Sequence, residues 1–194
     1  MCIFEESIDM LRARGASIGM QFDDLVEQGL IEILQVDPAE LAPGEFVNLV
    51  VQRVRGGDIR LMVIDSLNGY MQAMPDAKFL NIQAHELLSY LNRQGVLTVM
   101  TLAQHGLFAP NNTPVDLTYL ADTVILLRYF EQGGRIKKAI SVIKKRIGRH
   151  EDTIREFRID ERGIRLGEPL SSFHGVLTGN PTFDGASGDM LKDR

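Results

Sequence analysis

The sequence contains no tryptophan and only one cysteine, Cys2, in 194 residues. A single cysteine cannot form an intramolecular disulfide, so we expect a protein of a reducing compartment, the cytoplasm. Long hydrophobic runs are also absent, since the longest are about the length of a strand, and the first residues lack the basic-then-apolar order of a secretion signal. Neither a membrane span nor an export signal is therefore predicted.

An excess of positive charge is lacking as well. The chain has 21 lysines and arginines against 26 acidic residues, a net charge of −5 at pH 7. No evident series of aromatic residues could serve as a stacking platform for bases. Both observations argue against DNA binding, although a local basic patch could still contact an anion.

What is present is typical of a globular domain with a substantial core, with 44% hydrophobic and 24% charged residues. Apolar β-rich runs alternate with helical periodicity through the first hundred residues, and this order predicts an α/β fold with a parallel sheet. Strands are expected over residues 1–4, 30–34, 61–64 and 96–102, and helices over about 8–18, 23–28, 46–56 and 77–92, with a loop from 66 to about 75.

The pattern changes after residue 123. Strands are expected over residues 124–130 and 136–143, joined by a hairpin turn at Gly133-Gly134, and further strands over 153–159 and 164–166. The prediction is therefore a parallel sheet followed by antiparallel C-terminal strands. Residues 184–194 have little to bury and are expected to form a disordered tail behind a domain of residues 1–183.

An acidic residue ends the most strongly apolar strand, where Asp65-Ser66 follows Leu-Met-Val-Ile. Ligands of open α/β sheets collect outside the carboxyl ends of the strands, so Asp65 could hold a hydrated Mg²⁺ beside a phosphate, as in a Walker B motif. Asp-Ser before a helix is also how an ordinary helix N-cap looks, and the strand alone leaves both interpretations open.

Two further strand ends carry polar residues. Glu5 and Glu6 follow the first strand, where one could act as a general base on water, or where both could simply favour the start of a helix. Gln104 follows the strand at 96–102, so we predict that Gln104 lies at the same sheet edge as Asp65. A glutamine there could sense a phosphate, or be a loop amide bonded to the backbone.

Basic residues cluster at 144–150, Lys-Lys-Arg-Ile-Gly-Arg-His. Such a cluster can protect a sheet edge from pairing with another chain. It can also contact anions, with Arg146 suited to a bidentate phosphate grip and Lys144 to a point-charge contact. His150 by itself would be taken for a surface histidine.

Read together, these segments resemble the KaiC-like branch of the RecA superfamily of ATPases, over residues 3 to about 183. The likeness is carried by residues 4–7 (Phe-Glu-Glu-Ser), 63–67 (Val-Ile-Asp-Ser-Leu), 121–127, 144–150, 154–157 (Ile-Arg-Glu-Phe) and 179–182 (Gly-Asn-Pro-Thr). It implies a RecA-like three-layer α/β/α fold.

The same resemblance implies a nucleotide site. Glu5 and Glu6 would supply the catalytic base, Asp65 would serve Mg²⁺, and Ser66 and Gln104 would line the ATP site. Lys144 and Arg146 would reach the γ-phosphate of a nucleotide held by a neighbouring subunit, with His150 near that nucleotide. The implied partners are ATP and further subunits in a ring, expected to be a hexamer.

One motif of that family is missing. No Gly-x-x-x-x-Gly-Lys-Ser/Thr run, the Walker A loop, occurs between Met1 and Arg194. It should lie on a strand-to-helix turn before Ile3, so we expect the first strand of the domain and its Walker A turn to be absent. The adjacent Ser/Thr pair that clock members phosphorylate is reduced to Thr118 beside Tyr119, which argues against autophosphorylation.

Three functions compete on this basis. The first is a partial ATPase domain whose parent hydrolyses ATP at subunit interfaces for signalling or conformational regulation, this chain turning over little alone. The second is a non-catalytic regulatory partner that offers Lys144 and Arg146 to complete subunits. The third, less favoured, is a recombinase-like DNA binder.

Overall fold

The computed structural model describes residues 1–72, 77–103, 119–178 and 182–183. The chain divides into two compact units, Met1–Ala103 and Gln104–Arg194. Each is described by itself below.

The first unit is built on a four-stranded sheet of β1 (Cys2–Ile3), β2 (Leu34–Gln35), β3 (Leu61–Asp65) and β4 (Leu97–Met100). The strand order is β2-β1-β3-β4, and every neighbouring pair is parallel. This confirms the expected parallel sheet. Since β1 lies beside β3, the two strands end at the same edge, with Ile3 in register with Asp65.

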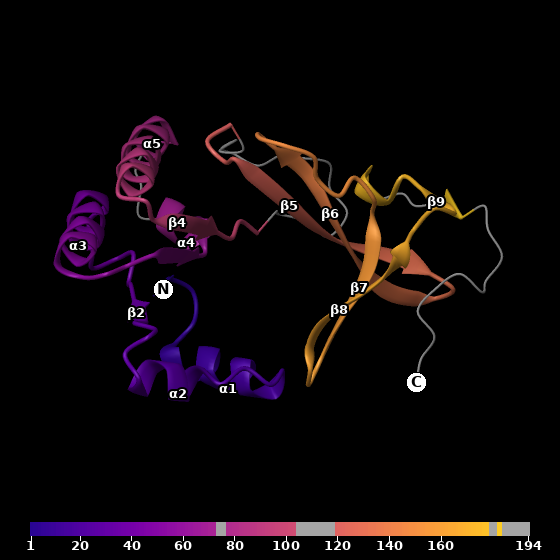
Figure 1. The fold of residues 1–194 in the computed structure, drawn as a ribbon, viewed down its shortest axis with the longest axis horizontal. Helices are drawn as coiled ribbons and strands as arrows, with labels where there is room; N and C mark the ends of the chain where they lie inside the picture. Colours follow the sequence, from indigo (N-terminus) through magenta and orange to yellow (C-terminus); the bar gives the residue numbers. More distant parts are fainter. Residues whose placement is uncertain (73–76, 104–118, 179–181, 184–194) are drawn as a thin grey trace. The chain divides into compact units, whose positions relative to one another are not determined.

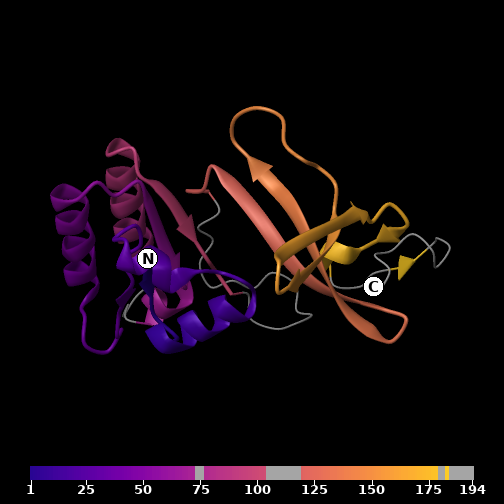
Figure 2. The same ribbon diagram turned by 60° about the horizontal axis from the view of Figure 1, so that its bottom comes forward.

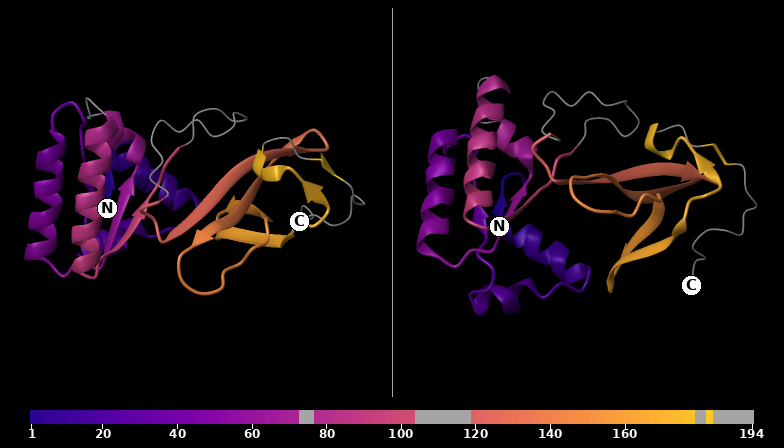
Figure 3. Two further views of the ribbon diagram at one scale, coloured as in Figure 1. Left: turned by 90° about the horizontal axis from the view of Figure 1, so that it is seen from above. Right: turned by 45° about the horizontal axis from the view of Figure 1, so that its top comes forward.

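Among the described residues of this unit, five helices accompany the sheet: α1 (Ile8–Ser17), α2 (Phe22–Glu27), α3 (Pro43–Gly56), α4 (Leu67–Gln72) and α5 (Ala77–Arg93). Helices α3 and α5 lie side by side on one face of the sheet, and α1 and α2 lie on the other (Figures 1 and 3). Right-handed crossovers require this arrangement, because the chain passes from β1 to β2 in one direction across the sheet and then from β2 to β3 and β4 in the other. The unit therefore has three layers.

The core lies between the sheet and the pair α3 and α5. Helix α3 buries Phe46, Val50 and Val54 at helical spacing, and α5 likewise buries Ala84, Leu87 and Leu91. At one end of this core, the ring centroids of Phe4 and Phe46 lie 5.3 Å apart and those of Phe46 and Tyr70 lie 5.2 Å apart. The aromatic cluster thereby joins the end of β1 to α3 and α4.

Two expected elements of this unit are wrong. The strand predicted over residues 30–34 begins only at Leu34, because α2 ends through Gly29 at φ 70° and the N–H groups of Leu30 and Ile31 both bond to the Leu25 carbonyl. The loop predicted from residue 66 instead contains α4, which starts directly after Ser66.

The second unit contains an antiparallel sheet of β5 (Thr123–Gln132), β6 (Arg135–Lys145), β7 (Arg155–Asp160) and β8 (Gly163–Pro169), in that order (Figure 2). The expected hairpin turn is confirmed, with Gly133 and Gly134 at φ 57° and 71°, values that suit glycine in a two-residue turn.

Short elements follow: β9 (Phe173–His174) pairs with β10 (Thr182–Phe183), and the 3₁₀ helix η1 spans Val176–Thr178. Phe173 of β9 and Val176 of η1 form the core of this unit together with Leu170 and with Phe130 and Ala139 of the sheet. Of the helices described in the two units, none is both long enough and apolar enough to cross a membrane.

Candidate functional site

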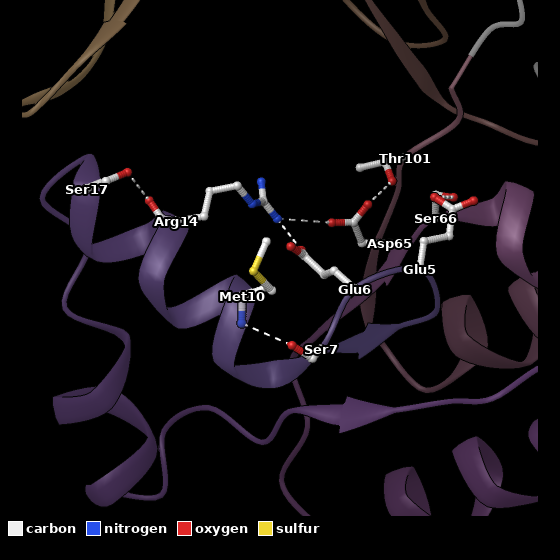
Figure 4. A network of polar contacts seen from close by, with 9 residues as sticks. All are labelled: Glu5, Glu6, Ser7, Met10, Arg14, Ser17, Asp65, Ser66 and Thr101. Carbon is white, nitrogen blue, oxygen red and sulfur yellow. Dashed lines mark hydrogen bonds and ion pairs between the residues drawn. The ribbon is translucent and has the colours of Figure 1, made fainter.

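Three predicted site residues meet at the carboxyl edge of the parallel sheet. The Phe4 N–H donates to the Asp65 carbonyl at 2.9 Å, which continues the pairing of β1 and β3 by one residue. Glu5 and Glu6 therefore leave the sheet beside Asp65, as Figure 4 shows. The placement follows from strand register alone, because parallel neighbours deliver their following residues to one edge.

Asp65 is held by Thr101, the residue that directly follows the neighbouring strand β4. Its Oδ1 accepts a 2.6 Å hydrogen bond from the Thr101 hydroxyl, and the Thr101 N–H donates to the Ile64 carbonyl at 3.0 Å. The Asp65 side chain stays 28% exposed. Its carboxylate is therefore oriented and still reachable from solvent. The peptide bond that follows it, to Ser66, is cis.

From the sequence, Asp65-Ser66 could belong to a nucleotide site or to an ordinary helix N-cap, and the contacts of Ser66 are compatible with both. Its hydroxyl donates to Glu5 Oε2 at 3.0 Å and also accepts from the Gly69 N–H at 3.4 Å, as an N-cap of α4 does. The residue is only 5% exposed. One buried hydroxyl thus starts the helix and orients a carboxylate of the cluster.

Glu6 is paired with a residue that sequence analysis did not single out, Arg14 of α1. Nη2 of Arg14 forms a short ion pair with Glu6 Oε1 and lies 3.9 Å from Asp65 Oδ2. The Ser7 hydroxyl accepts from the Met10 N–H at 3.2 Å and starts α1 directly after Glu6. Arg14 follows that cap by seven residues, two helical turns, and this spacing could have identified it.

Asn68 is a second residue that was missed. Its side-chain amide donates to the Ala103 carbonyl at 2.9 Å, and its Oδ1 accepts from the Ala103 N–H at 2.7 Å. This paired contact fixes the chain immediately before Gln104. Gln104 itself lies outside the described residues, so its predicted place at this edge stays a prediction.

A glycine lets α4 approach the cluster. A Cβ on Gly69 would lie far inside van der Waals distance of the Phe4 Cβ and 3.4 Å from Glu5 Cγ. Gly69 is therefore the point where α4 packs onto the segment that carries Glu5.

The basic residues lie in the second unit. Lys144 pairs with Val124 near the end of β6. The Arg146 guanidinium lies 3.2 Å from Asp122 Oδ1 and donates to the Tyr119 carbonyl at 3.2 Å, while the Arg146 N–H bonds to the Asp122 carbonyl at 2.7 Å. The next turn is closed by Lys145 Nζ donating to the Arg149 carbonyl at 3.0 Å, and His150 is exposed.

The donor set at Asp65 suits a hydrated magnesium ion. Over residues 1–72, 77–103, 119–178 and 182–183, no three His, Cys, Asp or Glu side chains gather as a metal cage. Mg²⁺ at nucleotide sites keeps several waters and uses only one or two carboxylates together with phosphate oxygens. A partly exposed Asp65, whose Oδ1 is oriented by the Thr101 hydroxyl, fits that requirement.

Comparison with known proteins identifies the family. The KaiC ATPase family model matches residues 1–171. The chain belongs to this family. The resemblance inferred from the sequence is confirmed, and the parallel sheet with its antiparallel C-terminal strands is consistent with a RecA-like KaiC domain.

Several of the proteins that this chain resembles are circadian clock proteins. The chain is 25% identical over 185 residues to the circadian clock protein KaiC3 of Synechocystis, covering 95% of this chain and 36% of that protein. It is 25% identical over 180 residues to the circadian clock oscillator protein KaiC of Synechococcus elongatus, covering 92% and 34%. For KaiC of Thermostichus vulcanus the values are 24% over 180 residues, 92% and 35%. The chain thus spans about a third of the length of these relatives.

Proposed function

We propose that this chain is part of a cytoplasmic ATPase subunit that acts in a ring, a hexamer, and uses ATP hydrolysis at subunit interfaces for signalling or conformational regulation. The observation that carries the proposal is the convergence of Glu5, Glu6 and Asp65 at one sheet edge, each oriented by a hydrogen bond or ion pair. An ATPase site needs such groups for a metal ion and for the attacking water.

The roles divide by position. Asp65, oriented by Thr101, would hold Mg²⁺ through water, and the ion when bound would neutralise charge on the phosphates. Glu5 or Glu6 would orient and deprotonate the attacking water. Ser66 keeps Glu5 in place, and Gln104 is assigned to the phosphate end of the nucleotide.

Lys144 and Arg146 would act on a nucleotide bound by a neighbouring subunit, with His150 close to it. A guanidinium that reaches developing phosphate charge accelerates phosphoryl transfer strongly. In support, the Arg146 guanidinium is already held in place by Asp122 and by the Tyr119 carbonyl. Holding the side chain in advance lowers the entropy lost on contact with an anion.

The printed sequence has no glycine-rich phosphate loop. We therefore propose that residues 1–194 hydrolyse little ATP alone. The same observation favours a second candidate, a non-catalytic partner that joins a ring of complete subunits and offers Lys144 and Arg146 to them.

One mixing experiment tests both. ATP turnover is measured for residues 1–194 alone, and then after mixing with a KaiC-family homologue that has a phosphate loop but carries alanine at its own positions matching Lys144 and Arg146. We expect negligible turnover alone and partial recovery in the mixture.

The double variant Lys144→Ala/Arg146→Ala should abolish that recovery. Arg162→Ala, at the β7–β8 turn outside the proposed site, is the matched control and should preserve it. Family-level turnover by the chain alone would overturn the dependence on a partner. No recovery on mixing would overturn the role of the basic residues.

A further inference from the structure

We propose that Arg14 is a built-in counter-cation for Glu6 and Asp65, which balances these carboxylates in the absence of a divalent cation and competes with such a cation for them. The inference rests on the proposed function, since it assumes that Asp65 serves a metal ion. It adds Arg14 as a residue that lowers the affinity of this site for the metal ion.

The geometry places one positive group between two negative ones. Glu6 and Asp65 follow neighbouring parallel strands, and the same nitrogen, Nη2 of Arg14, pairs with Glu6 and lies 3.9 Å from Asp65 Oδ2 (Figure 4). The two oxygens of Asp65 are thereby divided: Oδ1 accepts from Thr101, and Oδ2 faces the arginine. Oδ2 is the oxygen that would remain for a cation and its water shell.

Charge accounts for the competition. Two neighbouring carboxylates repel each other, and either a guanidinium or a divalent ion can relieve that repulsion. A cation that approaches Oδ2 meets the positive charge of Arg14 and has to displace it or lose affinity. Removing the charge of Arg14 should therefore strengthen cation binding.

Arg14 also borders solvent. Its side chain is 58% exposed, whereas the side chains of its partners are 25% and 28% exposed. It is carried by α1, whose start is fixed separately by the Ser7 cap. A swing of the arginine toward solvent would therefore leave the start of the helix intact, which would not hold for a structural anchor of the edge.

The test measures binding of Mn²⁺ alone, as a paramagnetic stand-in for Mg²⁺, by electron paramagnetic resonance at low ionic strength, with Mg²⁺ as competitor. We expect Arg14→Gln to raise the affinity about two- to fivefold, the range spanned by exposed ion pairs. Arg14→Lys keeps the positive charge, so its Mn²⁺ affinity should stay close to the wild-type value.

Arg12→Gln is the matched control. Arg12 lies on the same helix and is paired with Asp23 at 3.0 Å. This variant should leave Mn²⁺ affinity unchanged. Should Arg14→Gln lose its fold by circular dichroism, Arg14→Met keeps the apolar stem and takes its place; loss of fold in both would show a structural anchor and overturn the proposal.

A second substitution separates this proposal from the proposed function. Asp65→Asn should abolish the Mn²⁺ binding in both the wild-type and the Arg14→Gln background. Binding that depends on Asp65 but is unchanged or weakened by Arg14→Gln would overturn the counter-cation role and leave the metal site intact. Binding that ignores Asp65 would overturn the metal site itself.

Discussion

The Ser66 hydroxyl donates a 3.0 Å hydrogen bond to Glu5 Oε2 across the neighbouring strands β1 and β3. The two residues are 61 positions apart in the sequence. Ser66 is buried and also starts α4, so the orientation of Glu5 depends on the same group as the stability of that helix. A single substitution at Ser66 should therefore affect both the stability of α4 and the orientation of Glu5.

Ser66→Ala is expected to lower the free energy of unfolding by about 1–2 kcal/mol, the upper range for loss of an N-cap, because it also removes the hydrogen bond to a carboxylate. The measurement is urea unfolding followed by circular dichroism. Ser7→Ala is the matched control, since Ser7 caps α1 through the Met10 N–H at 3.2 Å. Equal losses in both variants would show that the Glu5 contact contributes nothing to stability.

Gly69→Ala is expected to destabilise the first unit by about 1–3 kcal/mol, the usual cost of overpacking a filled core. The added Cβ would overlap the Phe4 Cβ and crowd Phe4 Cγ at 3.1 Å, and Phe4 is itself fixed by the Phe46 and Tyr70 rings. Thermal unfolding measures the loss.

Gly44→Ala provides the comparison for Gly69. Gly44 lies in the first turn of α3, and a Cβ there has nothing within 4 Å. That variant should be neutral or stabilised by up to about 1 kcal/mol, because alanine is the better helix former. A neutral Gly69→Ala would mean that the segment carrying Glu5 can shift freely.

The sequence was sufficient to predict the parallel sheet and the meeting of its strand ends. The apolar run before Asp65 marks a buried parallel strand, and its register with Ile3 then determines where Glu5 and Glu6 lie. Such a prediction works because the backbone pairing of the strands determines where the side chains at their ends lie.

Contacts that side chains make across elements were not predictable from strand pairing, although the helical spacing from Ser7 could have indicated Arg14. Arg14 reaches Asp65 from a helix that is distant in sequence, and Asn68 binds the backbone 35 residues further on. Helix α4 was missed because Asn68-Gly69 looks like a turn, whereas the buried Ser66 cap and the packing of Gly69 on Phe4 decide for a helix. Those contacts exist only once the strands have paired.

Cys2 is expected to react slowly with a thiol reagent in the folded protein. Burial raises the pKa of the Cys2 thiol, against the opposing charges of the Met1 amino group and Arg53, and the residue is 4% exposed. Thiolate is the reactive form, so both accessibility and ionisation slow the reaction. Ellman's reagent at pH 8 should react fully only after urea is added.

Met62→Ala should speed that reaction and cost about 2–5 kcal/mol, because Met62 is buried and its Sδ lies 3.9 Å from the Cys2 sulfur. Met10→Ala is the control, since Met10 is exposed on α1. Rapid labelling of the untreated wild type would contradict the burial of β1 in the sheet.

Tyr70 should make the first unit sensitive to alkaline pH. Burial raises the pKa of Tyr70 to about 12 from an ordinary value of 10.0, and its hydroxyl lies 3.3 Å from Gln83 Oε1, to which it donates. Between these two pH values the unfolded chain has released the phenol proton and the folded chain has kept it. Stability is therefore fully present below pH 10 and falls as the pH rises toward 12.

Tyr70→Phe should flatten that fall, because phenylalanine has no proton to release, while costing a little stability at pH 7 through the lost hydrogen bond. The measurement is the urea midpoint between pH 9 and 11.5, with tyrosinate absorbance at 295 nm recorded in parallel. Tyr129→Phe removes an exposed phenol of β5 and should leave the alkaline loss unchanged. An identical pH dependence in wild type and Tyr70→Phe would show that the Tyr70 ring is open to solvent and that α4 does not close over the end of β1.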